Sequence, residues 1–540
     1  MRRWWPVLLL LAGATWICAA MWRVPWWQSH ENVCYPVRLV EYLDSWRAGH
    51  WYPRWCADFS GGYGNPFFNF YSPGVYAPAA LISLFGVAPT AAFKVVMLVA
   101  TLGGTAAMYG AILGETDRVD AALVGGALFV FLPYRVTDLF VRGDLAEYAA
   151  FCLVPLALWG LRALTRAMRA GDARRAAWGA IAAALALAGV VLAHTVTGLF
   201  ATELAGLYTL SLFWRERRAA WLAAAAIALS VGIAAVYVGP ALFEQGLVHI
   251  EALHWWKLAT GRNMVPLRAF VHDPFFSLGA PFLVGVIAWS GAFVLPQTRA
   301  TARRAAVWWI VPLVLLFLML PWCRAAWRVI PFGQQIQFPW RLLGLVGVFG
   351  AVGLGVLWAG IVPSSRAGLV AAVVVLAPLP LVVQSRRAVG PADPIPSTAE
   401  VLRMPGFTTT ATGEYIPRDV PIGGNPIRVA EAWSTSPGVL VRSERPDALH
   451  RDFTFDATGT ADITLGTFAF KGWELDDASA GVRLVERDGL YHLLADGPGH
   501  FEAHLSFHVT PLRRAASIVS LLALLATFLV LPRLARRLVG

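Results

Sequence analysis

Three hydrophilic stretches interrupt an otherwise apolar chain and carry the residues best suited to chemistry. His30 and Glu31 directly follow the first apolar segment. The stretch PYRVTDLFVRGDLAEYAAF (133–151) lies between two further apolar segments, and QQIQFPWRLL (334–343) places Arg341 at the start of another. A carboxylate can act as a general base or a metal ligand, and the planar guanidinium of arginine binds phosphate. We expect these three stretches to converge on one cavity.

The stretch 133–151 supplies most of the charge. Its acids are Asp138, Asp144 and Glu147, and its bases are Arg135 and Arg142. On a helix, Asp144 and Glu147 would share one face. The simpler interpretation is a solvated turn with paired charges, just as Glu31 could be a solvated interfacial acid and Arg341 a snorkelling arginine.

Aromatic residues, histidines and one lysine give weaker signals. Glycines in SGGYGNPFFNFYSPGVY (60–76) allow the backbone to approach a ligand closely, and stacked aromatic rings suit a sugar or a lipid headgroup. The candidates for sugar or acceptor binding are His30, Tyr63, Tyr71, His254, Trp255 and Trp256. Lys94 is a candidate phosphate ligand, although snorkelling at the start of an apolar segment is the favoured interpretation of this residue.

The composition is that of a polytopic membrane protein. Of 540 residues, 57% are hydrophobic and only 14% are charged, with a mean hydropathy of +0.58, whereas soluble chains average about 25% charged residues. Retention of Lys and Arg on the cytoplasmic side accounts for the net charge of +11. The chain has no basic patch interleaved with aromatic residues on a soluble domain, so nucleic acid is not an expected partner.

Twelve apolar segments have spanning length. They lie near 4–22, 88–113, 119–134, 146–166, 175–193, 196–213, 219–240, 277–296, 305–321, 341–360, 365–384 and 514–533. This count places Arg2, Arg3, the basic connections between spans and the arginine-rich C-terminus on one side, as the positive-inside rule requires. We therefore expect a multi-pass protein with both termini in the cytoplasm. The short apolar stretch 74–87 is expected to lie at the membrane surface.

The residues after 385 change in character. Alternating segments such as ADITLGTFAF and HFEAHLSFHV, bounded by Gly and Asp, predict antiparallel strands. We expect a helical membrane domain at 1–385, an extracytoplasmic β-sandwich at 386–513, and a last span with a basic cytoplasmic tail at 514–540. Cys34 and Cys56 share the first outer loop, and either a disulfide or two free thiols is possible there.

Several motifs carry a resemblance along nearly the whole chain. YPRW…GGYGNPFFNFYSPGVY, PYRVTDLFVRGDLAE, QFPWRLL, GEYIP, KGWEL and TPLRR resemble bacterial membrane proteins of the "6-pyruvoyl-tetrahydropterin synthase-related" family. The chain has neither the soluble body nor the zinc-type histidine cluster that a pterin synthase would need.

The layout is also similar to the C-type (GT-C) glycosyltransferases. This resemblance implies juxtamembrane helices and an acid in the first outer loop, further acids in the second, and a polyprenyl-phosphate-linked sugar as donor. By position, Glu31 matches the first-loop acid, and Asp138, or Asp144 with Glu147, matches the second. The implied phosphate ligands are Arg341, Arg135, Arg142 and Lys94. His30-Glu31 replaces the usual Asp-led pair, which leaves open whether Glu31 and Asp138 hold a divalent cation such as Mg²⁺ or Mn²⁺.

The expected function is therefore a glycosyltransferase of the bacterial inner membrane. It would move a sugar from a polyprenyl-phosphate donor to a glycan, lipid or protein acceptor at the outer face. Two alternatives stay open, namely a non-catalytic protein that binds glycan or lipid during envelope assembly, and a lipid or polysaccharide transporter. Transport is less favoured because several spans lack charge, whereas coupled transporters place ionisable groups at the midplane.

Overall fold

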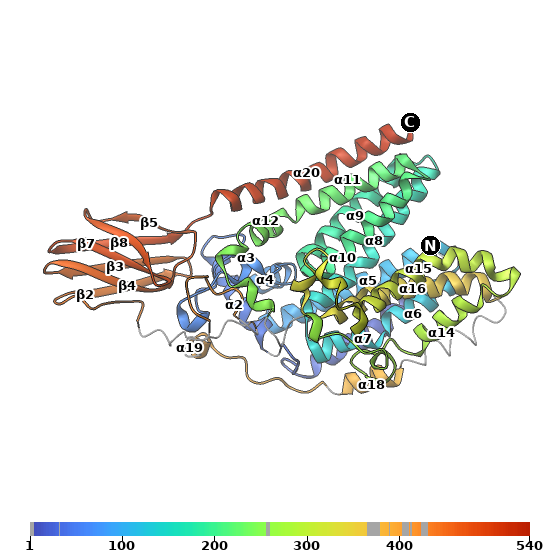
Figure 1. The fold of residues 1–540 in the computed structure, drawn as a ribbon, viewed down its shortest axis with the longest axis horizontal. Helices are drawn as coiled ribbons and strands as arrows, with labels where there is room; N and C mark the ends of the chain where they lie inside the picture. The colour runs from blue at the N-terminus through green and yellow to red at the C-terminus, as the bar shows by residue number, and fades with distance from the viewer. Residues whose placement is uncertain are drawn as a thin grey trace.

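A bundle of long helices and a separate β-domain make up the protein in its computed structural model (Figure 1). The structure describes residues 5–31, 33–254, 260–363, 379–387, 389–401, 410, 413–422 and 430–540. The β-domain projects from one end of the bundle, and the labels N and C both lie toward the opposite end (Figure 1). This arrangement fits the expected topology, in which both termini share one side of the membrane, although which side that is stays a prediction.

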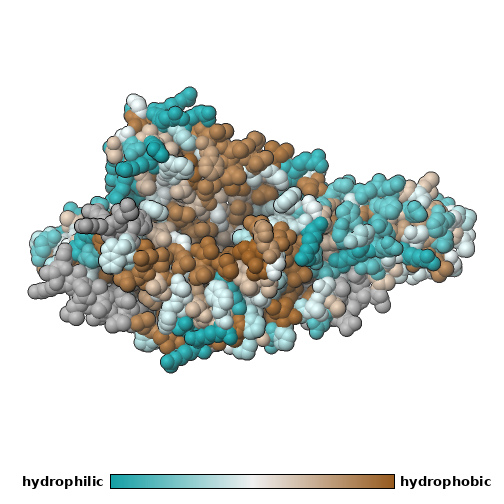
Figure 2. Space-filling model, turned by 180° about the vertical axis from the view of Figure 1, so that it is seen from behind, coloured by the Kyte–Doolittle hydropathy of each residue, from teal (hydrophilic) through white to brown (hydrophobic). Residues whose placement is uncertain are grey.

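The helical part contains the following helices in chain order. They are α1 (Val7–Cys18), α5 (Pro89–Thr116), α6 (Val119–Val130), α7 (Pro133–Thr137), α8 (Leu145–Arg169), α9 (Ala173–Ala193), α10 (Thr195–Phe213), α11 (Arg217–Ile233), α12 (Ala235–Phe243), α14 (Ala280–Gly291), α15 (Arg299–Met319), α16 (Leu343–Ile361), α18 (Leu379–Arg387) and α20 (Pro511–Val539). On the face seen in Figure 2, apolar side chains form a broad band across the helical part, whereas the β-domain surface is mostly hydrophilic.

Seven helices of the described residues are long and apolar enough to cross a membrane, and two bent pairs raise that number to nine. The pairs are Val119–Val130 with Pro133–Arg142, bent by 41°, and Arg217–Ile233 with Ala235–Phe243, bent by 66°. The expected spans 4–22 and 277–296 correspond to shorter apolar helices, Val7–Arg23 and Ala280–Gly291. Most of the expected span 365–384 lies outside the described residues. Twelve spans are therefore not confirmed.

Small residues allow the central helices to pack closely. A Cβ added to Gly160 of α8 would lie 2.6 Å from the backbone nitrogen of Ala183, and one added to Gly179 of α9 would lie 2.5 Å from that of Leu164. Small residues at such contacts let helix backbones approach in a bilayer. This contact joins the second half of α8 to the first half of α9, and the opposite ends of these two antiparallel helices contribute to the site described below.

The long loop after the first helix (24–88) forms a layer between the bundle and the β-domain (Figure 1). It contains the expected short helices: α2 (Cys34–Arg47), α3 (Phe67–Phe70) and α4 (Tyr76–Leu84). Helix α4 corresponds to the apolar stretch 74–87, and its nine residues are too few to span a bilayer. Both Cys34 and Cys56 are free thiols.

The C-terminal domain is a pair of four-stranded antiparallel sheets, ordered β1-β4-β7-β6 and β2-β3-β8-β5. The strands are β1 (Ala432–Ser434), β2 (Leu440–Asp447), β3 (His450–Ala457), β4 (Thr460–Phe468), β5 (Trp473–Ala478), β6 (Val482–Arg487), β7 (Leu490–Asp496) and β8 (Gly499–Phe507). Every second residue of β3 is buried, as the alternating sequence predicts. The antiparallel domain is thus confirmed.

The first loop and the β-domain share a buried aromatic contact. The ring of Tyr63 stacks on Phe468 with centroids 4.9 Å apart, and the backbone N–H of Phe468 donates to the carbonyl of Tyr63 at 3.0 Å. Arg445 of β2 lies 2.5 Å from Asp58. The aromatic and glycine-rich stretch of the first loop therefore forms part of the surface on which the β-domain packs.

Candidate functional site

The second hydrophilic stretch folds so that its three acids surround one arginine. A π-helical turn, η3 (Asp138–Arg142), follows α7 and ends at Gly143, whose φ is +67°. Arg142 Nη1 lies 2.8 Å from both Asp138 Oδ1 and Glu147 Oε1, and Arg142 Nη2 lies 3.3 Å from Asp144 Oδ2. A single π-helical turn of this kind is frequent at functional sites.

Asp144 and Glu147 are fixed by the start of α8. Asp144 is the N-cap residue and accepts a hydrogen bond from the backbone N–H of Glu147 at 3.1 Å. The expected proximity of these two acids therefore arises from helix capping. Glu147 also accepts a hydrogen bond from the hydroxyl of Tyr134 at 2.7 Å.

Gly143 joins this turn to the first loop. A Cβ at Gly143 would lie 2.2 Å from Ser29 Oγ. The backbone N–H of Glu31 donates to the carbonyl of Arg142 at 3.1 Å, and that of His30 donates to the carbonyl of Val141 at 3.0 Å. Glycine at 143 thus permits the close approach that places Glu31 beside the second acidic stretch.

Arg341 reaches the same cluster from the short helix η11 (Pro339–Leu342) before α16. Its Nε lies 3.3 Å from Glu147 Oε2 and its Nη2 lies 3.7 Å from Asp144 Oδ2. The structure thus brings Glu31, the acids of 133–151 and Arg341 together, whereas the cavity that they were expected to surround stays a prediction. The chemical role of the cluster stays a prediction.

Helix α2 adds residues that the sequence did not single out. The hydroxyl of Tyr35 donates to Asp144 Oδ1 at 3.1 Å and lies 3.4 Å from the hydroxyl of Tyr71. Arg38 Nη2 lies 3.3 Å from Glu31 Oε2, and its guanidinium faces the rings of Tyr35, Phe67 and Tyr71. One sequence signal could have identified them: Tyr35 and Arg38 are three residues apart, a spacing that places both side chains on one face of a helix. The same helix also contains Tyr42.

His194 also belongs to the cluster. It lies at the break between α9 and α10, and its Nδ1 accepts from the backbone N–H of Thr197 at 3.3 Å, so it caps α10. Its ring and the carboxylates of Asp144 and Glu147 offer atoms that all lie within 4.8 Å of one another. His194 therefore both caps α10 and lies beside the two acids.

Accessibility separates Glu31 from the other acids. The side chain of Glu31 is 35% exposed and that of Arg341 is 18% exposed, whereas Asp138 is 0% and Glu147 is 1% exposed. Burial raises the pKa of Glu31, an effect that Arg38 opposes and Asp144 reinforces. Glu31 is thus the acid of the cluster that a substrate can reach with least rearrangement, and its raised pKa suits a general base.

Burial also determines the protonation state of the His194 imidazole. It lowers the pKa of His194 to about 4, although Asp144 and Glu147 oppose the shift. The imidazole is therefore neutral at pH 7. Because Nδ1 accepts a hydrogen bond, the proton of the neutral ring lies on Nε2.

Among the described residues, one group has ligand atoms close enough together to hold a metal ion: Asp144, Glu147 and His194. Its contacts do not fit a bound cation. Arg142 and Arg341 already pair with both carboxylates, and the acceptor nitrogen of His194 is used by Thr197. The candidate pair Glu31 and Asp138 fits no better, since each already pairs with an arginine.

The remaining predicted residues do not take part in the ion pairs of the cluster. Lys94 Nζ donates to the carbonyl of Val24 at 2.7 Å, and Arg135 donates toward the carbonyl of Phe129 and the sulfur of Cys152 inside the bundle. His30 stacks on Phe275 near the cluster, with centroids 5.9 Å apart. Tyr63 contacts the β-domain, as described above. Trp255, Trp256 and the side chain of His254 lie outside the described residues.

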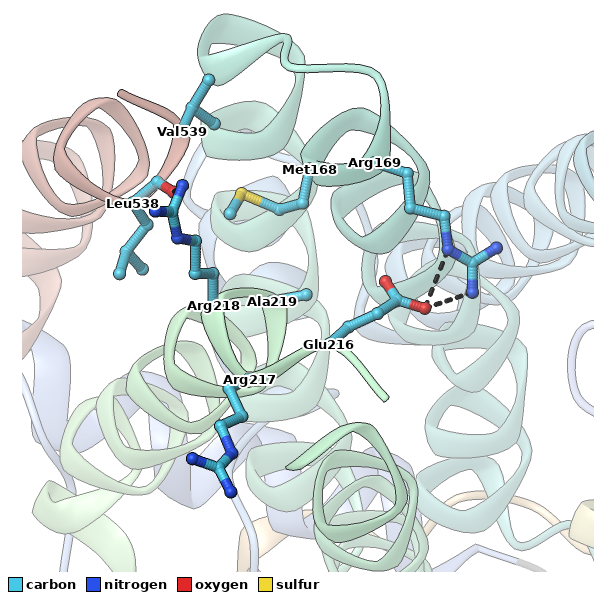
Figure 3. A pocket seen from close by; sticks show the side chains of 8 residues that line it. All are labelled: Met168, Arg169, Glu216, Arg217, Arg218, Ala219, Leu538 and Val539. Carbon is cyan, nitrogen blue, oxygen red and sulfur yellow. Dashed lines mark hydrogen bonds and ion pairs between the residues drawn. The ribbon is translucent and has the colours of Figure 1, made fainter. Parts of the chain in front are cut away.

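A separate pocket of about 240 Å³ lies at the opposite end of the bundle (Figure 3). It is lined by the end of α8, the start of α11 and the end of α20: Met168, Arg169, Glu216, Arg217, Arg218, Ala219, Leu538 and Val539. Its one carboxylate, Glu216, pairs with Arg169, whose Nε lies 2.8 Å from Glu216 Oε1. This pocket contains no uncommitted base, so it is a weaker candidate for catalysis than the Glu31 cluster.

Fold and site together define a helical membrane protein with a charged cluster at the end of the bundle that carries a β-domain. The chain belongs to the family described as "6-pyruvoyl-tetrahydropterin synthase related domain; membrane protein", which it matches over residues 68–389. That range contains the second acidic stretch, His194 and Arg341, whereas Glu31 precedes it. No curated protein and no solved structure matches the chain.

Proposed function

We propose that this protein is a membrane glycosyltransferase that moves a sugar from a polyprenyl-phosphate donor to an envelope acceptor. The transfer would take place at the end of the bundle that carries the β-domain, which we assign to the outer face of the bacterial inner membrane. The observation that carries the proposal is the position of Glu31. It is an accessible carboxylate with a raised pKa, beside a partly exposed arginine, in a cluster whose other acids are buried.

In the proposed reaction, Glu31 takes the proton of the acceptor hydroxyl. The acceptor oxygen then forms a bond to the anomeric carbon of the donor sugar. The bond from that carbon to the phosphate oxygen breaks, and its electron pair leaves with the polyprenyl phosphate. General-base assistance of this kind typically contributes about 10²–10⁴-fold in rate.

Arg341 would stabilise the departing phosphate. It is the more exposed of the two arginines that contact the acids of α8, since the side chain of Arg142 is 9% exposed and lies against three carboxylates. A guanidinium at the cluster's rim can turn toward a phosphate oxygen, whereas Arg142 cannot leave without exposing several buried charges. Asp138, Asp144 and Glu147 would therefore position the two arginines.

The proposal is tested with purified protein and a panel of radiolabelled polyprenyl-phosphate sugars. Arg341→Ala should weaken donor binding and slow transfer, because it removes a phosphate ligand. Arg47→Ala is the matched control, since Arg47 ends α2 and its side chain is 66% exposed. Unchanged donor binding by the folded Arg341→Ala protein would remove the support for this role.

A second candidate function is non-catalytic binding of a lipid-linked glycan. The observation that favours it is the pairing of both arginines with carboxylates, which is also what a purely structural cluster requires. Donor binding without any transfer, across all acceptors offered, would favour this candidate.

A further inference from the structure

The pocket of Figure 3, at the end of the bundle opposite to the β-domain, is basic. It is lined by the last turn of α8, the first turn of α11 and the last turn of α20. Its charged side chains are Arg169, Arg217, Arg218 and Glu216. Three arginines against one glutamate leave two positive charges in excess on the lining, and such an excess attracts an anion.

Internal contacts use only part of this positive charge. Glu216 Oε1 accepts a hydrogen bond from Arg169 Nε at 2.8 Å, and the other oxygen of Glu216 is buried. Arg218 Nη1 donates to the carbonyl of Leu538 at 3.2 Å, which leaves the charge of Arg218 in place. Arg217 is exposed and makes no hydrogen bond or ion pair with the described residues. Arg217 and Arg218 therefore keep charges that a ligand can pair with.

Neighbouring charges do not cancel this excess. Arg536 and Arg537 lie in the last turn of α20 and outnumber the terminal carboxylate of Gly540. Asp172, the acid of the turn between α8 and α9, already pairs with Arg175 at 3.3 Å. The first turn of α11 contains no acid, so the positive end of the helix dipole adds to the local potential. The surroundings of the pocket are therefore also positive.

The rest of the lining is apolar, and it consists of Met168, Ala219, Leu538 and Val539. Figure 3 shows Met168 between Arg218 on one side and the pair of Arg169 and Glu216 on the other. The volume of about 240 Å³ is below the roughly 300–1,000 Å³ of pockets that enclose a whole drug-sized ligand. The pocket therefore fits a small charged group that continues into an apolar part.

Exposed tryptophans indicate the depth of the pocket in a bilayer. Trp178 lies near the start of α9, Trp214 directly follows α10, and Trp221 lies near the start of α11. They are 59%, 82% and 59% exposed. Tryptophan is enriched at the membrane–water interface, where its ring lies at the level of the lipid headgroups. Because Trp214 and Trp221 flank the first turn of α11, the pocket lies at headgroup depth.

We propose that this pocket binds the phosphodiester of an anionic phospholipid from the surrounding membrane. Arg217 and Arg218 would donate hydrogen bonds to the phosphate oxygens, and the apolar lining would contact the glycerol and the first acyl carbons. Basic pockets between membrane helices bind acidic lipid headgroups. The bound lipid would contact α8, α11 and α20 together, so it would hold the last helix of the chain against the bundle.

The test is native mass spectrometry of the full-length protein, released from mixed micelles that contain phosphatidylglycerol or phosphatidylcholine. Both lipids have the phosphodiester, but only phosphatidylglycerol carries a net negative charge, so the protein should retain it in preference. Arg217→Gln removes one positive charge at a residue without contacts to the described part of the chain. It should weaken the apparent affinity for phosphatidylglycerol about fivefold, as expected for one arginine near a lipid headgroup.

Arg303→Gln is the matched control, because Arg303 is an exposed arginine near the start of α15 that does not line the pocket. It should keep the full affinity. Equal retention of the two lipids by the unmodified protein would overturn the proposal. Equal affinity of the two variants for phosphatidylglycerol, whether lowered or unchanged, would also overturn it, since the pocket would then not be the site. Displacement of the lipid by sodium phosphate, but not by sodium chloride at equal ionic strength, would instead identify free phosphate as the ligand.

Discussion

Replacement of Glu31 by glutamine distinguishes a catalytic role of this residue from a structural one. The change keeps the size of the side chain and removes the base. In the folded protein, Glu31 makes an ion pair of 3.3 Å with Arg38 and is 35% exposed. Because the side chain of Arg38 is only 3% exposed, the pair contributes more than the roughly 1 kcal/mol of an exposed pair and less than the about 3–5 kcal/mol of a fully buried one. Arg38 would retain its 3.3 Å hydrogen bond to the hydroxyl of Tyr76, so we expect a loss of stability clearly smaller than that caused by removing a fully buried acid.

The expected loss of turnover is much larger, about 10²–10⁴-fold, because the acceptor hydroxyl loses its base. The acid limb of the pH–rate profile should lie above the ordinary range of a glutamate, because burial raises the pKa of Glu31, and it should disappear in the Glu31→Gln protein. Transfer is measured as polyprenyl phosphate released from labelled donor, and stability as the Tm in the same detergent.

Glu147→Gln is the contrasting variant. Glu147 is buried and pairs with Arg142 and Arg341, so its removal should cost about 3–5 kcal/mol of stability. If Glu31→Gln protein destabilised the fold as strongly as Glu147→Gln protein, or if it kept full turnover, the assignment of Glu31 as the base would be refuted.

Further predictions concern titration, backbone geometry and topology. The pKa of His194 is lowered to about 4, so the folded state resists protonation of this residue. The free energy of unfolding should therefore fall by up to about 3 kcal/mol as the pH drops from 6.5 to 4. A His194→Gln protein should lose this dependence in thermal melts recorded at a series of pH values. Gly143→Ala should cost about 1–3 kcal/mol, because φ is +67° and the new Cβ would meet Ser29; a Tm equal to that of the unmodified protein would contradict this geometry. Reporter fusions after residue 170 should indicate the cytoplasm and those near residue 450 the outside, and the opposite pattern would overturn the topology.

Local features of the site were predictable from sequence, whereas its assembly was not. The spacing of Asp144 and Glu147 indicated that the two acids lie together on a helix, and they do so as the N-cap and first turn of α8. Strand alternation identified β3, β4, β6, β7 and β8. The sequence did not identify β1, β2 or β5, since β1 is three residues long and β2 and β5 carry many charges. Arg135 and Lys94 are cationic like the proposed phosphate ligand Arg341, and only the packing shows that they donate to backbone carbonyls.

The contact between the first loop and the β-domain joins residues that are synthesised at very different times. Tyr63 emerges from the ribosome early, but its stacking partner Phe468 follows about 400 residues later. At a translation rate of about 5–20 residues per second, the aromatic surface of the first loop stays uncovered for roughly 20–80 s, until the strands that pack on it have been synthesised. Helix α20, which packs on α9 and α11, is made later still. The membrane domain therefore inserts with both its aromatic face and one helix-packing face uncovered, and apolar surface exposed in this way makes a partly folded chain prone to aggregation.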